Sequence, residues 1–230
     1  MARARFPPEL SPTLRLYEPS GSDEGRQKPL PLLIYLHGGG WTIGSLNSCG
    51  HFCDYMAATG RMKVLAADYR LAPEHPFPQG LSDCTAAVAY AREHAEALGI
   101  DTTQVSVGGD SSGGNLAIAT ALAPECRGRI AALLLFYPVT KAFPDGSSSW
   151  NAYGNGYGLD ADIMEAFNAS YLVGGADVRD HRISPGLAPD SLLRQLPPTL
   201  LIAAGRDILR DQGKAFARRL PRQVRRIEFP

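Results

Sequence analysis

The alternation of short, continuous apolar runs with segments of helical periodicity constrains the fold of this chain more than any other feature. Apolar runs without a polar residue at every second position are typical of strands buried on both faces, and therefore of a mostly parallel sheet covered by helices. Connections between such strands are expected to be right-handed. The sequence thus predicts an α/β class, with strands at 14–17, 32–36, 63–68, 104–107, 131–136, 199–203 and 224–229.

Helical periodicity separates these runs. The clearest helix is 82–98, which carries alanine and valine on one face and charged residues on the other. Asp160 is a candidate N-cap for one of the others. We expect helices at 82–98, 115–122, 160–171 and 212–220.

One long stretch breaks this alternation. Residues 140–198 show one convincing helix and no clear strand, and their first part is rich in Gly, Ser, Asn and Tyr. Long irregular segments inside compact domains are usually lids or binding loops. We therefore expect residues 1–230 to form a single domain, with 140–198 as a lid or cap insertion over its site.

The first motif with chemical meaning is Gly109-Asp110-Ser111-Ser112-Gly113, which lies between a predicted strand and a predicted helix. This glycine–x–serine–x–glycine pattern arises by chance in roughly 0.16 copies for such a composition, so its context matters. A tight strand-to-helix turn needs nearly side-chain-free residues two positions before and after the serine. The motif therefore predicts Ser111 as a nucleophile, with a glycine-rich phosphate or turn loop as the alternative.

The second motif is His37-Gly38-Gly39-Gly40, directly after a predicted strand, and it is far rarer by chance. A tetrahedral intermediate needs two or three N–H donors aimed at its oxyanion, and glycines let the backbone come that close. We predict Gly39 and Gly40 as donors, Gly38 as an optional third, and the N–H of Ser112 as their partner. His37 is expected to brace the loop rather than carry a proton.

Two further motifs follow in order. Tyr69-Arg70-Leu71-Ala72-Pro73-Glu74 comes after a predicted strand, and Asp207-Ile208-Leu209-Arg210-Asp211 comes after another. With these four motifs the chain resembles the hormone-sensitive lipase family of α/β-hydrolases, in its bacterial esterase branch. The resemblance runs over nearly the whole chain, from about 14 to 229. It departs from the family pattern at Ile208, where the family usually has proline.

This resemblance implies an α/β-hydrolase fold and a serine carboxylesterase that cleaves small, short-chain acyl esters through an acyl-enzyme, without cofactor or metal. It also implies that Asp207 is the acid of the catalytic triad, which orients a histidine. A helix-capping role for Asp207 is the alternative, and Asp211 is the nearest competitor. An amidase, lactonase or aryl-formamidase would use the same apparatus, and a non-catalytic small-molecule receptor of the same fold would retain both motifs.

The histidines do not fit the expected order of serine, then acid, then histidine. The chain has five, and none follows Asp207. His181 is the only one weighed as a substitute base. We therefore expect the sequence to be truncated before the family's catalytic histidine, which would follow Pro230, and residues 1–230 alone to be essentially inactive.

Charge and terminal composition exclude several other partners. Lys and Arg together number 23, as do Asp and Glu, so nothing recruits nucleic acid. No secretory signal follows Arg3 and Arg5, and the longest apolar run, 130–139, is too short to span a bilayer. We expect a cytoplasmic protein without a membrane span, whose partner is a small ester; a homodimer stays open.

The four cysteines suggest neither a disulfide framework nor a metal site. Cys49 and Cys53 lie four residues apart with His51 between them, which raises the question of zinc. No second pair at ligand spacing accompanies them. We expect buried thiols and no metal.

Overall fold

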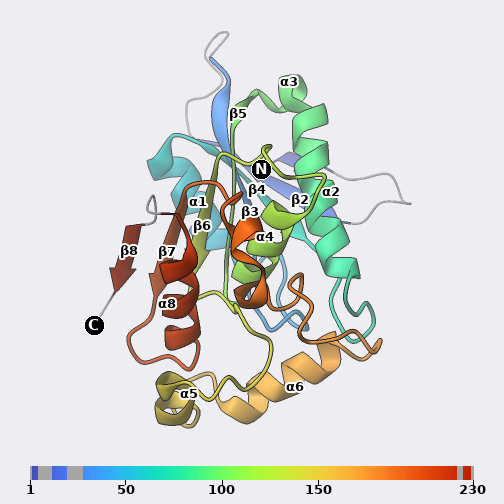
Figure 1. Cartoon of the computed structure of the whole chain (residues 1–230). Coiled ribbons are helices and arrows are strands. Elements are labelled where there is room, and N and C mark those ends of the chain that lie inside the picture. The colour runs from blue at the N-terminus through green and yellow to red at the C-terminus, as the bar shows by residue number, and fades with distance from the viewer. Residues whose placement is uncertain (1, 5–11, 20–27, 222–224, 229–230) are drawn as a thin grey trace.

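The computed structural model describes residues 2–4, 12–19, 28–221 and 225–228. Its centre is an eight-stranded sheet in the order β1-β2-β4-β3-β5-β6-β7-β8 (Figure 1). β2 pairs antiparallel with β1 and β4, whereas all the other neighbours are parallel. The strands are β1 (Ala2–Ala4), β2 (Thr13–Tyr17), β3 (Leu30–Leu36), β4 (Lys63–Asp68), β5 (Ile100–Asp110), β6 (Ala132–Phe136), β7 (Thr199–Ala203) and β8 (Arg225–Glu228).

Helices cover both faces of this sheet, as the apolar runs predict. One buried cluster joins one sheet face to α2, α4 and α8, and a second joins the other face to α1. Alternate residues of β3 show the division, because Ile34 belongs to the first cluster and Tyr35 to the second. The helices are α1 (Gly50–Gly60), α2 (Gln79–Glu93), α3 (Ala95–Leu98), α4 (Ser112–Leu122), α5 (Ser148–Tyr153), α6 (Ala161–Tyr171), α7 (Asp190–Leu193) and α8 (Arg210–Arg219), with a short 3-10 turn, η1 (Pro185–Leu187).

Each predicted strand has a counterpart among the described residues, although 224 and 229 of the last one lie outside them, and the central strand is longer than predicted. β5 continues to Asp110 because its carboxyl end pairs on both sides, Gly109 with Leu36 of β3 and Asp110 with Phe136 of β6. Two glycines in a row hid this continuation in the sequence. The strand pairing thus carries the chain directly up to Ser111.

The helices differ more from prediction. The predicted helix 82–98 begins earlier and divides at His94 into α2 and α3. α1 was not predicted, because only Cys53 and Ala57 of its residues are buried and its apolar face is weak. Cys49 and Cys53 are buried free thiols at this helix.

Residues 140–198, the predicted insertion, hold more regular structure than their composition suggests: α5, α6, η1 and α7 all fall within them. α5 and α6 lie together at one end of the sheet (Figure 1). Asp160 takes the N-cap position of α6, as predicted, but its carboxylate accepts the N–H of Gly156 (2.7 Å) rather than one from the helix. It therefore fixes the preceding turn.

Candidate active site

Ser111 occupies the turn between β5 and α4 in a conformation that side chains rarely adopt, with φ 53° and ψ −117°. Backbone hydrogen bonds hold it on both sides: its N–H donates to Phe136 O (2.9 Å) and its carbonyl accepts from Val139 N (3.1 Å). α4 begins at the next residue, Ser112, so the serine hydroxyl stands at a helix N-terminus. Such a terminus favours developing negative charge.

The two motif glycines have a steric reason. A Cβ on Gly109 would lie 2.4 Å from the carbonyl oxygen of Leu36, and a Cβ on Gly113 would lie 2.0 Å from the same oxygen. Real Cβ atoms essentially never approach backbone that closely. Only glycine at both positions lets β3, β5 and α4 pack this tightly beneath Ser111.

In the glycine loop after β3, residues 38–40, one backbone amide already donates a hydrogen bond. Gly38 donates its N–H to Asp110 Oδ1 (3.1 Å), and the same oxygen accepts the Tyr35 hydroxyl (2.9 Å). Gly39 and Gly40 have positive φ angles of 121° and 58°. Neither donates its N–H in a hydrogen bond between residues that the structure describes.

His37 lies buried at the base of this loop. Its Nδ1 donates to Gly38 O (2.7 Å), and its own carbonyl accepts the Tyr69 hydroxyl (2.7 Å). The two rings stack with centroids 4.4 Å apart. Burial lowers the pKa of His37, so the ring stays neutral and braces the loop.

Asp207 lies on the loop between β7 and α8, half-buried. Its Oδ1 accepts the N–H of Leu209 (2.8 Å), a local turn contact that leaves Oδ2 available. Burial raises the pKa of this carboxyl, an effect that the Leu209 N–H partly offsets. Asp207 thus fixes the turn before α8 and does not cap the helix, whose N-cap residue is Leu209. Its Oδ2 accepts no hydrogen bond between described residues.

Asp211, the competing carboxylate, is committed elsewhere. Its Oδ2 accepts the N–H of Ser149 in α5 (2.9 Å), and Arg210 pairs with its Oδ1 (2.9 Å). Ser149 in turn donates its hydroxyl to Ile208 O (3.0 Å). Asp211 thus anchors the start of the insertion to α8.

A cavity of about 360 Å³ brings the predicted residues together. Ser111, Asp207, Gly39 and Gly40 all line it, whereas the Ser112 side chain is fully buried below. The remaining lining residues are Ile43, Tyr137, Tyr157, Leu159, Phe167, Ala204, Arg206 and Leu209.

None of the five histidines, all of which the structure describes, lines this cavity. His37 is buried in the loop, and His181 lines a different cavity beside α2 and α4. The residue weighed as a substitute base is therefore not placed with Ser111.

The aromatic residues of the insertion divide in a way the sequence did not reveal. Of Trp150, Tyr153 and Tyr157, only Tyr157 lines the cavity. Tyr153 instead accepts a hydrogen bond from Arg210 of α8 (3.2 Å). Phe167 of α6 was missed: its ring fills the space where a Cβ on Gly40 would lie, 2.1 Å from that position. The position of Phe167 in the predicted helix is typical of an ordinary core residue. Only the folded structure brings its ring to the glycine loop.

Comparison with known proteins identifies relatives. A family model described as alpha/beta hydrolase fold matches residues 33–229. A carboxylesterase of Mycobacterium tuberculosis, NlhH, is 38% identical over 240 residues, covering 94% of this chain and 74% of the relative. An ethyl acetate hydrolase of Pseudomonas putida is 40% identical over 210 residues, covering 90% and 64%.

The solved structures similar to this chain are also ester hydrolases. An ester hydrolase from the metagenome of Lake Arreo, complexed with a bipyridine phosphonate derivative, superposes with a TM-score of 0.91 at 37% identity, covering 100% of this chain and 73% of that one. The thermostable carboxylesterase EstE1 superposes with a TM-score of 0.86 at 31% identity, covering 94% and 74%. No helix among the described residues has the length and apolar character needed to cross a membrane.

Proposed function

This chain belongs to the α/β-hydrolase family and is a carboxylic ester hydrolase, and from that premise we propose that Ser111 is its nucleophile. One observation carries the proposal. Ser111 is held at positive φ on the strand-to-helix turn and opens into the same cavity as Gly39, Gly40 and Asp207. Strain of this kind is kept where the surrounding structure enforces it, and it concentrates at functional sites.

In the proposed reaction, Ser111 Oγ attacks the ester carbonyl and the alcohol leaves, forming an acyl-enzyme that water then hydrolyses. The N–H groups of Gly39, Gly40 and Ser112 would donate to the developing oxyanion. Gly38 plays a different part here, because its N–H holds Asp110 and so fixes the loop. Preorganised donors of this sort need no rearrangement as the charge develops.

A serine hydroxyl also needs a base within hydrogen-bond reach. We propose that Asp207 Oδ2 orients the imidazole of that base, while Oδ1 is kept in place by Leu209. None of the five described histidines lines the cavity, so we propose none of them as that base.

Labelling with an activated phosphonate ester tests the nucleophile. We expect one covalent adduct on Ser111, found by mass spectrometry of peptides. Ser111→Ala should lower kcat/KM of an active form of the enzyme by about 10⁵ to 10⁶ and abolish labelling, with the fold intact. Ser112→Ala is the matched control and should keep most of the activity. If Ser112→Ala were dead and Ser111→Ala active, the nucleophile would be misassigned.

We further propose that the substrates are short-chain acyl esters. The cavity of about 360 Å³ is at the small end of ligand sites, and Tyr157, Leu159 and Phe167 limit its extent. One relative is an ethyl acetate hydrolase. We expect kcat/KM to peak among acetyl to hexanoyl p-nitrophenyl esters and to fall for longer chains. Values that rise steadily to the palmitoyl ester would refute this.

A further inference from the structure

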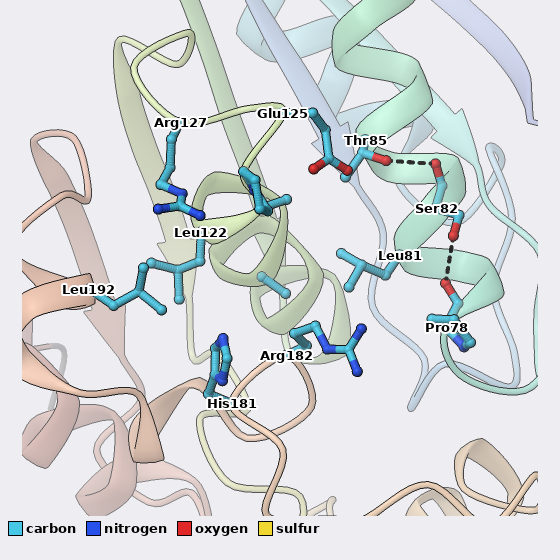
Figure 2. A pocket seen from close by; sticks show the side chains of 13 residues that line it. Pro78, Leu81, Ser82, Thr85, Leu122, Glu125, Arg127, His181, Arg182 and Leu192 are labelled. Atoms are coloured by element: carbon cyan, nitrogen blue, oxygen red, sulfur yellow. Dashed lines mark hydrogen bonds between the residues drawn. The ribbon is translucent and has the colours of Figure 1, made fainter.

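A second cavity, of about 590 Å³, lies beside α2 and the carboxyl-terminal end of α4 (Figure 2). It is larger than the cavity at Ser111 and shares no lining residue with it. Its size is in the usual range of small-molecule sites. The ester hydrolase reaction described above makes no use of it.

The floor of this cavity is apolar. Leu81 of α2, Ala119 and Leu122 of α4, and Leu192 of α7 line it. The two hydroxyls at its edge already donate hydrogen bonds to backbone carbonyls at the start of α2. Ser82 donates to Pro78 O (3.2 Å) and Thr85 donates to Ser82 O (3.0 Å), as the dashed lines in Figure 2 mark. Because these donors are occupied, the floor offers a ligand mainly hydrocarbon contact.

Arg127 supplies an unsatisfied donor at one end. Its Nη1 reaches Gln195 Oε1 at 3.3 Å, but its Nε is buried and has no hydrogen-bond partner among the described residues. The buried Nε cannot be reached from the cavity. The donor that a ligand there would meet is Nη2, which takes part in no hydrogen bond between described residues.

The charges around the cavity favour an anion. Arg182 is already paired with Asp180 (2.6 Å), whereas no ion pair between described residues involves Arg127. Figure 2 shows Arg127 and His181 on the same side of the cavity as Leu192, with Glu125, the acid of the lining, near Thr85. In this view the Glu125 carboxylate lies beside Thr85 and not beside Arg127, while His181 Nδ1 is 3.9 Å from Asp180 Oδ1.

We propose that this cavity binds a small amphipathic monocarboxylate, with its carboxylate on Arg127 and its hydrocarbon chain over Leu122 and Leu81. A guanidinium that holds a carboxylate gains charge-assisted hydrogen bonds. The acid released by ester hydrolysis is of this chemical class. The site is distinct from the one at Ser111, so it stands independently of the roles proposed there.

Isothermal titration of the Ser111→Ala protein with octanoate tests the proposal without turnover. We expect saturable binding that strengthens about fourfold per added methylene from hexanoate to octanoate. Octanamide, which has the same chain without the charge, should bind at least about tenfold more weakly. Octanoate that fails to bind, or octanamide that binds equally well, would overturn the proposal.

Two variants assign the binding to this cavity. Arg127→Gln should weaken octanoate binding about tenfold or more, and Ala123→Phe should block it by filling the cavity while keeping Arg127. Arg129→Gln is the matched control, since Arg129 is an exposed arginine on the same loop outside the cavity. Binding unchanged by Arg127→Gln and Ala123→Phe would place octanoate elsewhere, and an equal loss in Arg129→Gln would reduce it to general charge attraction. Thermal unfolding checks that each variant is folded.

Discussion

The two halves of the site are held in place by different means. Around Ser111 the geometry rests on close packing of backbone against backbone, with Gly113 directly beneath the carbonyl of Leu36. Around Asp207 it rests on hydrogen bonds between distant segments: Ser149 of α5 binds both Ile208 and Asp211. Both kinds of support join segments that are far apart in the sequence, but the first tolerates no added atom, whereas the second depends on polar groups.

The difference explains why one half carries an obvious sequence motif and the other does not. Steric exclusion demands glycine at fixed spacing from the serine, and that demand is visible in the sequence. Hydrogen bonds accept several residue types, so the contacts that hold Asp207 leave only a weak trace. We therefore expect substitution of the glycines packed around Ser111 to act mainly through stability, and substitution of Asp207 to act mainly through activity.

Among the substitutions that compare the two halves of the site, Asp207→Asn should have the largest effect, and that effect should be on kcat/KM. The substitution keeps the shape and the Oδ1 contact to Leu209 but removes the charge that would stabilise an imidazolium. We expect kcat/KM for p-nitrophenyl acetate, measured on an active form of the enzyme, to fall by about 10³ to 10⁴ with little change in unfolding free energy.

Asp211→Asn is the matched control, because Asp211 contacts Ser149 and Arg210 rather than the cavity. It should cost less than about tenfold in kcat/KM. If Asp211→Asn were the more damaging change, the acid would be misassigned.

Gly113→Ala tests the surroundings of Ser111, which are held in place by close packing of backbone against backbone. Its Cβ would lie 2.0 Å from Leu36 O and 2.5 Å from His37 O, so strand and helix must separate. We expect a loss of roughly 3 kcal/mol or more in unfolding free energy, which corresponds to about 6–12 °C in Tm for a chain of this size. Calorimetry or denaturant unfolding measures it.

Gly174→Ala is the control for this change, since the nearest atom to its added Cβ is Pro76 Cγ at 3.7 Å. Its unfolding free energy should change by no more than about 0.5 kcal/mol. Equal losses in the two variants would show that backbone contact does not set the cost.

Substitution of His37 should have the smallest effect of these tests, and that effect should appear in the pH dependence of the unfolding free energy. Burial lowers its pKa below the ordinary 6.5, although Asp68 and Asp110 oppose the shift. The unfolded chain therefore binds a proton as pH falls through about 6.5 while the folded chain resists, so stability is lost on acidification and this loss is absent above that pH. The slope from this one group is at most about 1.4 kcal/mol per pH unit.

Denaturant unfolding between pH 7.5 and 5.5 should show a shallower pH dependence in His37→Gln than in the parent. His51→Gln, at an exposed position of α1, is the control and should keep the parent slope. A parent-like slope in His37→Gln would mean that other groups set the acid response.

Much of the fold could be predicted because buried parallel strands have continuous apolar runs in their sequence, as in β3 and β4. α1 could not, since its helix buries only one narrow strip. At the site, the positions of Ser111 and the glycine loop follow from local sterics. The closeness of Phe167 to Gly40 could not be predicted, because it depends on how a segment 127 residues later folds back onto the loop.

The contact between Phe167 and Gly40 couples the electrostatics of the loop to the position of α6. An N–H group attracts an anion far more strongly where water is excluded, since water screens the charge. The aromatic ring keeps hydrocarbon against the backbone of Gly40. A Phe167 ring displaced from the loop would let solvent reach these amides and would lower the local field, so the strength with which the loop can hold charge depends on the position of α6.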